Sequence, residues 1–132
     1  MPVGDTGAAL TELERAVKTL GLKGIIFNGA YQESYFDEDR FFPIFEMAQE
    51  LKVPVMLHPG EVPTEVAKTY YQGSWPVAVA NVFAGHGIGW HYDAWVQYMR
   101  MILSGIFDRL PNLQLICGHW GELLPYYFNR MD

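Results

Sequence analysis

The sequence contains one cysteine, Cys117, no long apolar run and few basic side chains among its 132 residues. A single cysteine excludes an internal disulfide and a four-cysteine zinc site, and its place in a short apolar run indicates a buried thiol. No apolar run approaches the roughly 20 residues of a membrane span, so neither a span nor a membrane partner is expected. The first residues lack a basic region followed by an apolar segment, so no signal peptide is expected. The resulting prediction is a cytoplasmic protein.

Acidic residues outnumber basic ones, with 15 Asp and Glu against 9 Lys and Arg and a formal net charge of −6. This balance argues against a nucleic-acid partner, because no basic stripe is present to neutralise phosphates. It does not exclude a charged small molecule, since a few local charges can reverse the field inside a cleft. Half of the residues are hydrophobic and 15% are aromatic, so residues 1–132 are expected to form a single globular domain.

Helical and strand patterns alternate along the chain. Apolar residues at helical spacing predict four helices, at about 8–20, 40–51 and 91–110 and from about 122 onwards. Short apolar runs predict three buried strands, at 23–28, 53–58 and 113–118. Asp5 or Thr6 is suited to cap the first helix, and Gly21 to end it. Repeated alternation with short connections is typical of a parallel α/β sheet.

The region from 59 to 90 breaks this rhythm. It has no clear period, and a connection of about thirty residues is long for a compact domain, so we expect it to be functional or mobile. Its pattern leaves open a short helix or strand between Tyr70 and Val82. The glycines from 85 to 89 lack the strand and spacing of a nucleotide-binding loop, so no nucleotide cofactor is expected. Further on, Gly105 inside the predicted 91–110 helix costs ~1 kcal/mol relative to alanine, which indicates close packing there.

Histidines follow two of the three predicted strands. His58 leaves the second strand before Pro59, and His119 leaves the third, with Glu122 three residues later. The carboxyl ends of parallel strands are where α/β folds place their sites, so His58 is a candidate metal ligand or general base. Glu122 is suited to orient the His119 imidazole for catalysis. As alternatives, His58 is a hydrogen-bonded histidine in a packed rim, and Glu122 begins a helix at its positive end.

Other polar residues have simpler interpretations. His86 is expected to face solvent in its glycine-rich stretch, and His91 to cap or pack at the start of the long helix. Asp93 is expected to interact with the dipole of that helix from its first turn. Asn28 is interpreted as a turn-stabilising residue rather than a substrate contact. The tryptophans that could either stack on an aromatic acid or pack in the core are Trp75, Trp90 and Trp120.

Several of these motifs together resemble the amidohydrolase superfamily. They are Val55-x-Leu57-His58-Pro59, the run Ser-Gly-Ile-Phe-Asp-Arg-Leu-Pro-Asn-Leu at 104–113, and Gly118-His119-Trp120-Gly121-Glu122 followed by Pro125. The segment 13–24 fits as well, so the resemblance covers nearly the whole chain. Specifically, the motifs resemble the amidohydrolase-related branch of metal-dependent decarboxylases, such as the γ-resorcylate and aminocarboxymuconate-semialdehyde decarboxylases.

The resemblance implies a TIM (β/α)8 barrel with one divalent metal, zinc or manganese, at the carboxyl ends of the strands. By position, His58 matches the metal-binding histidine, His119 the acid/base or water-positioning histidine, and Glu122 its carboxylate partner. The implied activity is decarboxylation of a small, aromatic carboxylic acid, whose carboxylate binds the metal while a proton reaches the ring carbon. Hydrolysis by metal-activated water, as in other members of the superfamily, is the alternative.

Two parts of the family pattern have no counterpart in this sequence. No His-x-His pair like that of the family's first strand occurs, and no late strand with an aspartate ligand is recognised. A barrel needs about 200 residues or more, so we expect about three βα units from the middle of a partial barrel. Open sheet edges and uncovered apolar faces predict a homo-oligomer. A catalytically inactive, self-associating remnant is therefore a further alternative, which a measurement of bound metal would distinguish.

Overall fold

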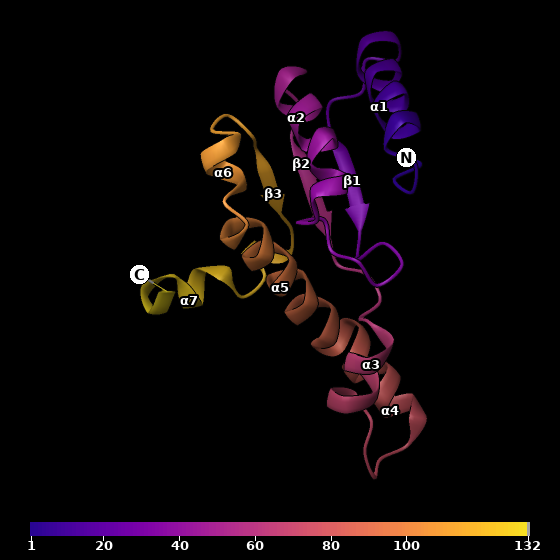
Figure 1. Ribbon diagram of the computed structural model, residues 1–132. Coiled ribbons are helices and arrows are strands. Elements are labelled where there is room, and N and C mark those ends of the chain that lie inside the picture. The colour runs from indigo at the N-terminus through magenta and orange to yellow at the C-terminus, as the bar shows by residue number, and fades with distance from the viewer. Residues whose placement is uncertain (132) are drawn as a thin grey trace.

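The computed structural model describes residues 1–131 and contains a three-stranded parallel sheet in the order β1-β2-β3 (Figure 1). The strands are β1 (Ile25–Asn28), β2 (Val55–His58) and β3 (Leu115–Cys117). Their order along the chain is their order in the sheet, as expected for neighbouring strands of a parallel barrel. The predicted α/β fold, a partial barrel of three consecutive units, is confirmed, although each strand is shorter than predicted.

Two helices connect the amino terminus to the first two strands. α1 (Thr6–Glu14) continues as a π-helical turn at Arg15–Thr19 and begins earlier than predicted. Asp5 is its cap, because its carboxylate accepts a hydrogen bond of 2.9 Å from the Ala8 amide. Gly21 follows with a φ of +72°, the left-handed conformation that ends many helices. α2 (Phe42–Glu50) follows a short 3-10 turn and packs beside α1.

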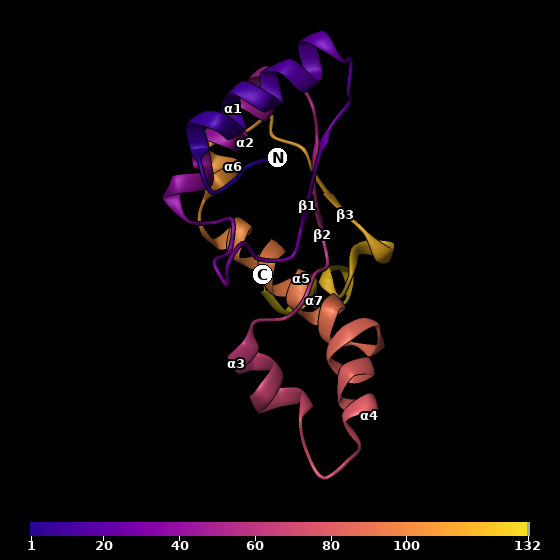
Figure 2. The same ribbon diagram turned by 90° about the vertical axis from the view of Figure 1, so that its right-hand side faces the viewer.

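The helices cover one face of the sheet only. Figure 2 views the sheet nearly edge-on, with α1, α2 and α6 on the same side. Phe27, Val55 and Leu57 point to that side and are buried, with exposed fractions of 5%, 0% and 0%. The alternate residues Ile26 and Ile116 point the other way and are 56% and 45% exposed. Because strand side chains alternate between faces, the second face of this sheet is an uncovered apolar surface.

The predicted 91–110 helix is in fact two helices, α5 (Gly89–Leu103) and α6 (Ile106–Arg109). Gly105 separates them with a φ of +72°. A Cβ added to this glycine would meet only the Asp108 carboxylate, at 3.5 Å. The expectation of close packing at Gly105 was therefore wrong. Glycine is suited to this position because residues with a Cβ rarely adopt the left-handed backbone conformation.

Tyr98 anchors α5 to the ends of two strands. Its hydroxyl donates to the Leu57 carbonyl at 2.9 Å and accepts from the Leu57 amide at 3.2 Å. The same hydroxyl also contacts the Ile116 carbonyl oxygen of β3. Two further contacts join α5 to the loop before α2. Arg100 pairs with Asp37 at 2.7 and 2.9 Å, and the Tyr35 hydroxyl donates to Asp93 at 2.6 Å.

The region without a sequence period consists largely of short helices. α3 (Thr64–Val66) and α4 (Val77–Val82) each continue into a π-helical turn, and Figure 1 shows this pair projecting beyond the carboxyl ends of the strands. These elements bury few side chains, chiefly Tyr71 and Ala80, which explains why no apolar period marks them in the sequence. The last helix is α7 (Leu124–Met131). Over residues 1–131, none of the helices combines the length and apolar character that a membrane crossing requires.

Candidate active site at the strand exits

His58 is the last residue of β2 and lies on the uncovered face of the sheet, in register with Asn28 of β1. Its Nδ1 is 2.7 Å from the Pro59 carbonyl oxygen. A carbonyl can only accept, so Nδ1 carries the proton and the lone pair is on Nε2. Metal-binding histidines are commonly oriented in this way. The conformation of His58 therefore fits a metal ligand acting through Nε2.

The main chain leaves β1 and β2 through two touching glycines. Gly29 has a φ of +63°, and a Cβ on Gly60 would lie 2.5 Å from the Gly29 Cα. No real Cβ makes so close a contact, so a side chain at Gly60 would push the two strand exits apart. His58 is thereby held next to the exit of β1 by main-chain packing and by the Gly29 amide, which donates to the His58 carbonyl at 2.9 Å.

The chain leaves β3 through an unusual turn. Four successive residues, His119, Trp120, Gly121 and Glu122, have φ values of 43°, 65°, 88° and 51°. Non-glycine residues in this region are strained, and such strain is often found at functional sites. Trp120 is 99% exposed, which rules out core packing for this tryptophan. Since α7 begins only at Leu124, the interpretation of Glu122 as a helix-starting residue is wrong.

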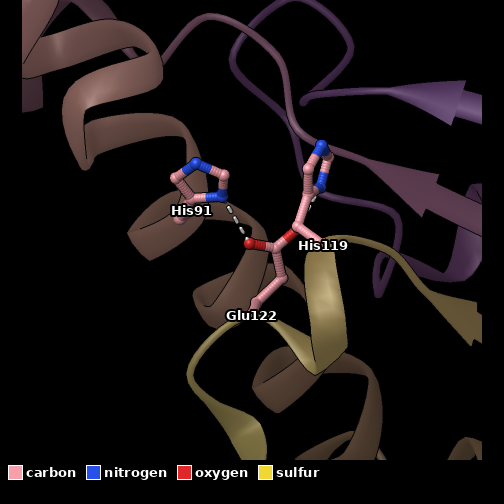
Figure 3. Close-up of side chains that lie close together, drawn as sticks. All are labelled: His91, His119 and Glu122. Carbon is pink, nitrogen blue, oxygen red and sulfur yellow. Dashed lines mark hydrogen bonds and ion pairs between the residues drawn. The ribbon is translucent and has the colours of Figure 1, made fainter.

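The turn places the Glu122 carboxylate between two imidazoles (Figure 3). The carboxylate is 0% exposed, Oε1 lies 2.8 Å from Nδ1 of His119, and Oε2 lies 2.8 Å from Nδ1 of His91. An ionised carboxylate only accepts hydrogen bonds, so both Nδ1 atoms donate. Burying a charge is costly unless it is paired and hydrogen-bonded. Here each carboxylate oxygen has its own donor.

Three imidazole rings thus lie close together, with His119 next to both of the others. The His119 ring centroid lies 5.2 Å from that of His58 and 5.1 Å from that of His91. The structure brings together the three residues selected from the sequence, His58, His119 and Glu122. It adds His91, whose expected role was capping or packing. Nothing local could reveal this contact, because His91 and Glu122 are 31 residues apart in the chain.

The sequence interpretation is confirmed for His86 but not for Asp93. His86 is exposed, as predicted. Asp93 lies beyond the first turn of α5 and is 4% exposed, so the predicted interaction with the helix dipole was wrong. Burial raises the pKa of Asp93, and the hydrogen bond from Tyr35 opposes that shift only in part.

The donor set suits a divalent transition metal. Among the described residues, potential ligand atoms of His91, His119 and Glu122 lie within 4.8 Å of one another, and His58 is adjacent to His119. Imidazole nitrogen and carboxylate oxygen are ligands that zinc and manganese accept. Burial and the nearby Glu122 charge raise the pKa of the Cys117 thiol to about 11, so this thiol is protonated at neutral pH in the metal-free protein. Glu122 and the Nδ1 atoms of His91 and His119 bind one another, whereas Nε2 of His58 is left to hold an ion.

A parallel α/β sheet with imidazole and carboxylate groups at its strand exits is the arrangement of metal-dependent barrel enzymes. The family model described as amidohydrolase matches residues 1–129, so the chain belongs to the amidohydrolase family.

Two of the relatives with curated names are decarboxylases. The chain is 37% identical to decarboxylase orsB of Emericella nidulans, over 98% of this chain and 39% of that protein. It is 35% identical to γ-resorcylate decarboxylase of a Polaromonas species, over 100% of this chain and 40% of that protein. The chain therefore spans well under half the length of these relatives.

Two solved structures are similar over the whole chain. One, described as an amidohydrolase from Staphylococcus aureus, is 42% identical with a TM-score of 0.97, and the match covers 43% of that protein. The other is dihydroxybenzoic acid decarboxylase of Polaromonas with bound manganese and the inhibitor 2-nitroresorcinol. It is 33% identical with a TM-score of 0.86, and the match covers 40% of that protein. In both comparisons the three-stranded unit corresponds to part of a larger protein.

Proposed function

We propose that this chain carries the central part of the active site of a metal-dependent decarboxylase acting on a small aromatic carboxylic acid. The observation that carries the proposal is the position of His58, with Nε2 free, beside the hydrogen-bonded pair of His119 and Glu122. The decarboxylases among its relatives and the aromatic inhibitor bound by one of them support this substrate class.

The metal in this proposal is manganese, the ion carried by the similar dihydroxybenzoic acid decarboxylase. His58 would hold the ion through Nε2, and residues outside the three strands would complete the site. When bound, the ion supplies positive charge that binds and polarises the substrate oxygens.

His119 has the role of general acid in this proposal. Its Nδ1 is bonded to Glu122, so Nε2 is the atom that holds and delivers the proton. The proton goes to the ring carbon that carries the carboxylate. The bond from that carbon to the carboxylate then breaks, its electron pair returns to the ring, and CO2 leaves. The buried carboxylate of Glu122 stabilises the charge of the imidazolium before transfer and keeps the ring oriented.

Hydrolysis is the second candidate, and the amidohydrolase description of the family and of the Staphylococcus aureus protein favours it. In that reaction His119 would position an attacking water or accept its proton, with Glu122 in the same supporting role. The two reactions are distinguished by their products, since only decarboxylation releases CO2 and places a solvent proton on the ring carbon.

The test uses the protein expressed from its complete reading frame and supplied with manganese. Turnover of 2,6-dihydroxybenzoate, followed by loss of substrate absorbance and by CO2 release, is the expected result. His58→Ala should abolish turnover, whereas His86→Ala, a change at an exposed histidine, should leave it intact. Protein that binds no metal above background and releases no CO2 from any aromatic acid would instead support the inactive remnant.

A further inference from the structure

His91 comes from a different part of the fold than the other site residues. It lies at the start of α5, whereas His58 and His119 leave strands. Its position depends on a close approach of main chain, because a Cβ on Gly89 would lie 2.0 Å from the Ala84 carbonyl oxygen. Its side chain is 32% exposed, and its one polar contact among residues 1–131 is with Glu122.

The contact determines how the Glu122 carboxylate is held. Within the described part of the chain, its oxygens have two hydrogen-bond donors, His119 on Oε1 and His91 on Oε2. Two donors on opposite oxygens fix the carboxylate plane, whereas one donor would leave it free to rotate. Without His91, Oε2 would be a charged oxygen with no donor in a side chain that is 0% exposed.

We propose that His91 is a positioning residue for His119, acting through Glu122. It holds the carboxylate so that Oε1 stays aimed at Nδ1 of His119, and thereby keeps His119 Nε2 directed at the reacting carbon. This inference rests on the proposed function for its effect on turnover, but the hydrogen-bonded array itself does not depend on the reaction.

A purely structural role for His91 is disfavoured by how α5 is attached. The Tyr98 hydroxyl binds both main-chain groups of Leu57, and Arg100 forms a two-point pair with Asp37. These contacts hold the helix independently of His91. Removing the His91 imidazole should therefore change the orientation of the carboxylate more than the stability of the fold.

The first test compares two substitutions in the manganese-loaded enzyme. His91→Leu removes the donor, and kcat should fall about 10- to 100-fold, as for other outer-shell partners of active-site groups, while KM changes little. His91→Asn keeps an N–H donor near the position of Nδ1 and should retain most of the wild-type kcat. His86→Leu is the matched control at an exposed histidine and should have no effect. Equal kcat values for wild type and His91→Leu, or no rescue by asparagine, would overturn the proposal.

A second measurement is independent of activity. In proton NMR of the manganese-free, 15N-histidine-labelled protein, the slowly exchanging Nδ1–H resonances of wild type should include one from His91 and one from His119. The His119 resonance should broaden in His91→Leu and be retained in His91→Asn. Absence of the two resonances in wild type, or an unchanged His119 resonance in His91→Leu, contradicts the array. An enzyme without turnover but with these NMR results would refute the proposed function and leave the array in place.

Discussion

His58 and His119 face each other across the exits of β2 and β3, with ring centroids 5.2 Å apart and ring planes inclined by 60°. Different partners hold the two rings. The Pro59 carbonyl accepts from His58, whereas the buried carboxylate of Glu122 accepts from His119. A carbonyl partner orients a neutral imidazole for metal binding, and a carboxylate partner can stabilise an imidazolium. In the proposed function, His58 therefore binds the metal and the neighbouring His119 transfers the proton.

These two roles predict that one substitution weakens manganese binding and another lowers kcat. His58→Ala should weaken manganese binding by at least about tenfold, since even indirect ligand partners have effects of about 10- to 100-fold. His119→Asn should leave manganese binding nearly unchanged and lower kcat by about 10² to 10⁴, the usual contribution of a general acid. Isothermal titration with manganese and steady-state kinetics measure the two effects. Loss of manganese binding in His119→Asn would contradict this prediction, because it would show that His119 is a metal ligand as well as His58.

The anchoring of α5 predicts a stability effect at Tyr98. In Tyr98→Phe, the buried Leu57 amide and carbonyl lose their hydroxyl partner. Leu57 keeps its pairing with β3, so the loss is that of ordinary hydrogen bonds of about 0.5–1.5 kcal/mol each, and the free energy of unfolding should fall by about that amount in urea titrations. Tyr126→Phe is a matched control, because Tyr126 is 80% exposed. Equal midpoints for the two variants would show that the hydroxyl contributes nothing at the strand ends.

Asp93 predicts a pH dependence of stability. Burial raises the pKa of its carboxyl above the ordinary value of 3.8, so the folded state binds this proton more readily than the unfolded state. The associated stability is present below the ordinary pKa and is lost as the pH rises through the raised one. Asp93→Asn keeps an acceptor for the Tyr35 hydroxyl and removes the ionisation.

Urea unfolding from about pH 4 to about pH 7 should therefore show wild type losing stability relative to Asp93→Asn as the pH rises. Asp108→Asn, at an exposed aspartate, is the control and should follow wild type. Parallel stability curves for wild type and Asp93→Asn would mean that Asp93 is charged at no net cost in the folded protein.

The uncovered sheet face predicts self-association of the 132-residue chain. Ile26 and Ile116, 56% and 45% exposed, form an apolar surface with Met56 between them, and no strand within residues 1–131 pairs with the outer edge of β1 or β3. Analytical ultracentrifugation should find dimers or larger species. Ile26→Lys combined with Ile116→Lys should shift the chain to monomer, whereas Leu103→Lys on α5 should not. A wild-type monomer of high thermal stability would refute the prediction.

The sequence predicted the order of helices and strands because their apolar patterns reflect one-sided burial. His58, His119 and Glu122, which were selected because they follow strong apolar runs, lie close together in the structure. The sequence did not predict His91, since that contact depends on how α5 packs across the sheet. The sequence also failed to predict the break at Gly105, where a residue in the left-handed conformation divides a continuous apolar stripe. It did not predict α3 and α4, because these exposed helices have no periodic pattern of apolar residues.

The contact between Gly29 and Gly60 restricts how this protein can diverge in sequence. The helices can exchange side chains as long as their inner faces remain apolar. At Gly29 and Gly60 the main chains touch, with 2.5 Å between the Gly29 Cα and any Cβ on Gly60. Neither position can accept another residue unless the rim beside His58 is rebuilt. Gly29 and Gly60 therefore have to be conserved together or replaced together in related sequences.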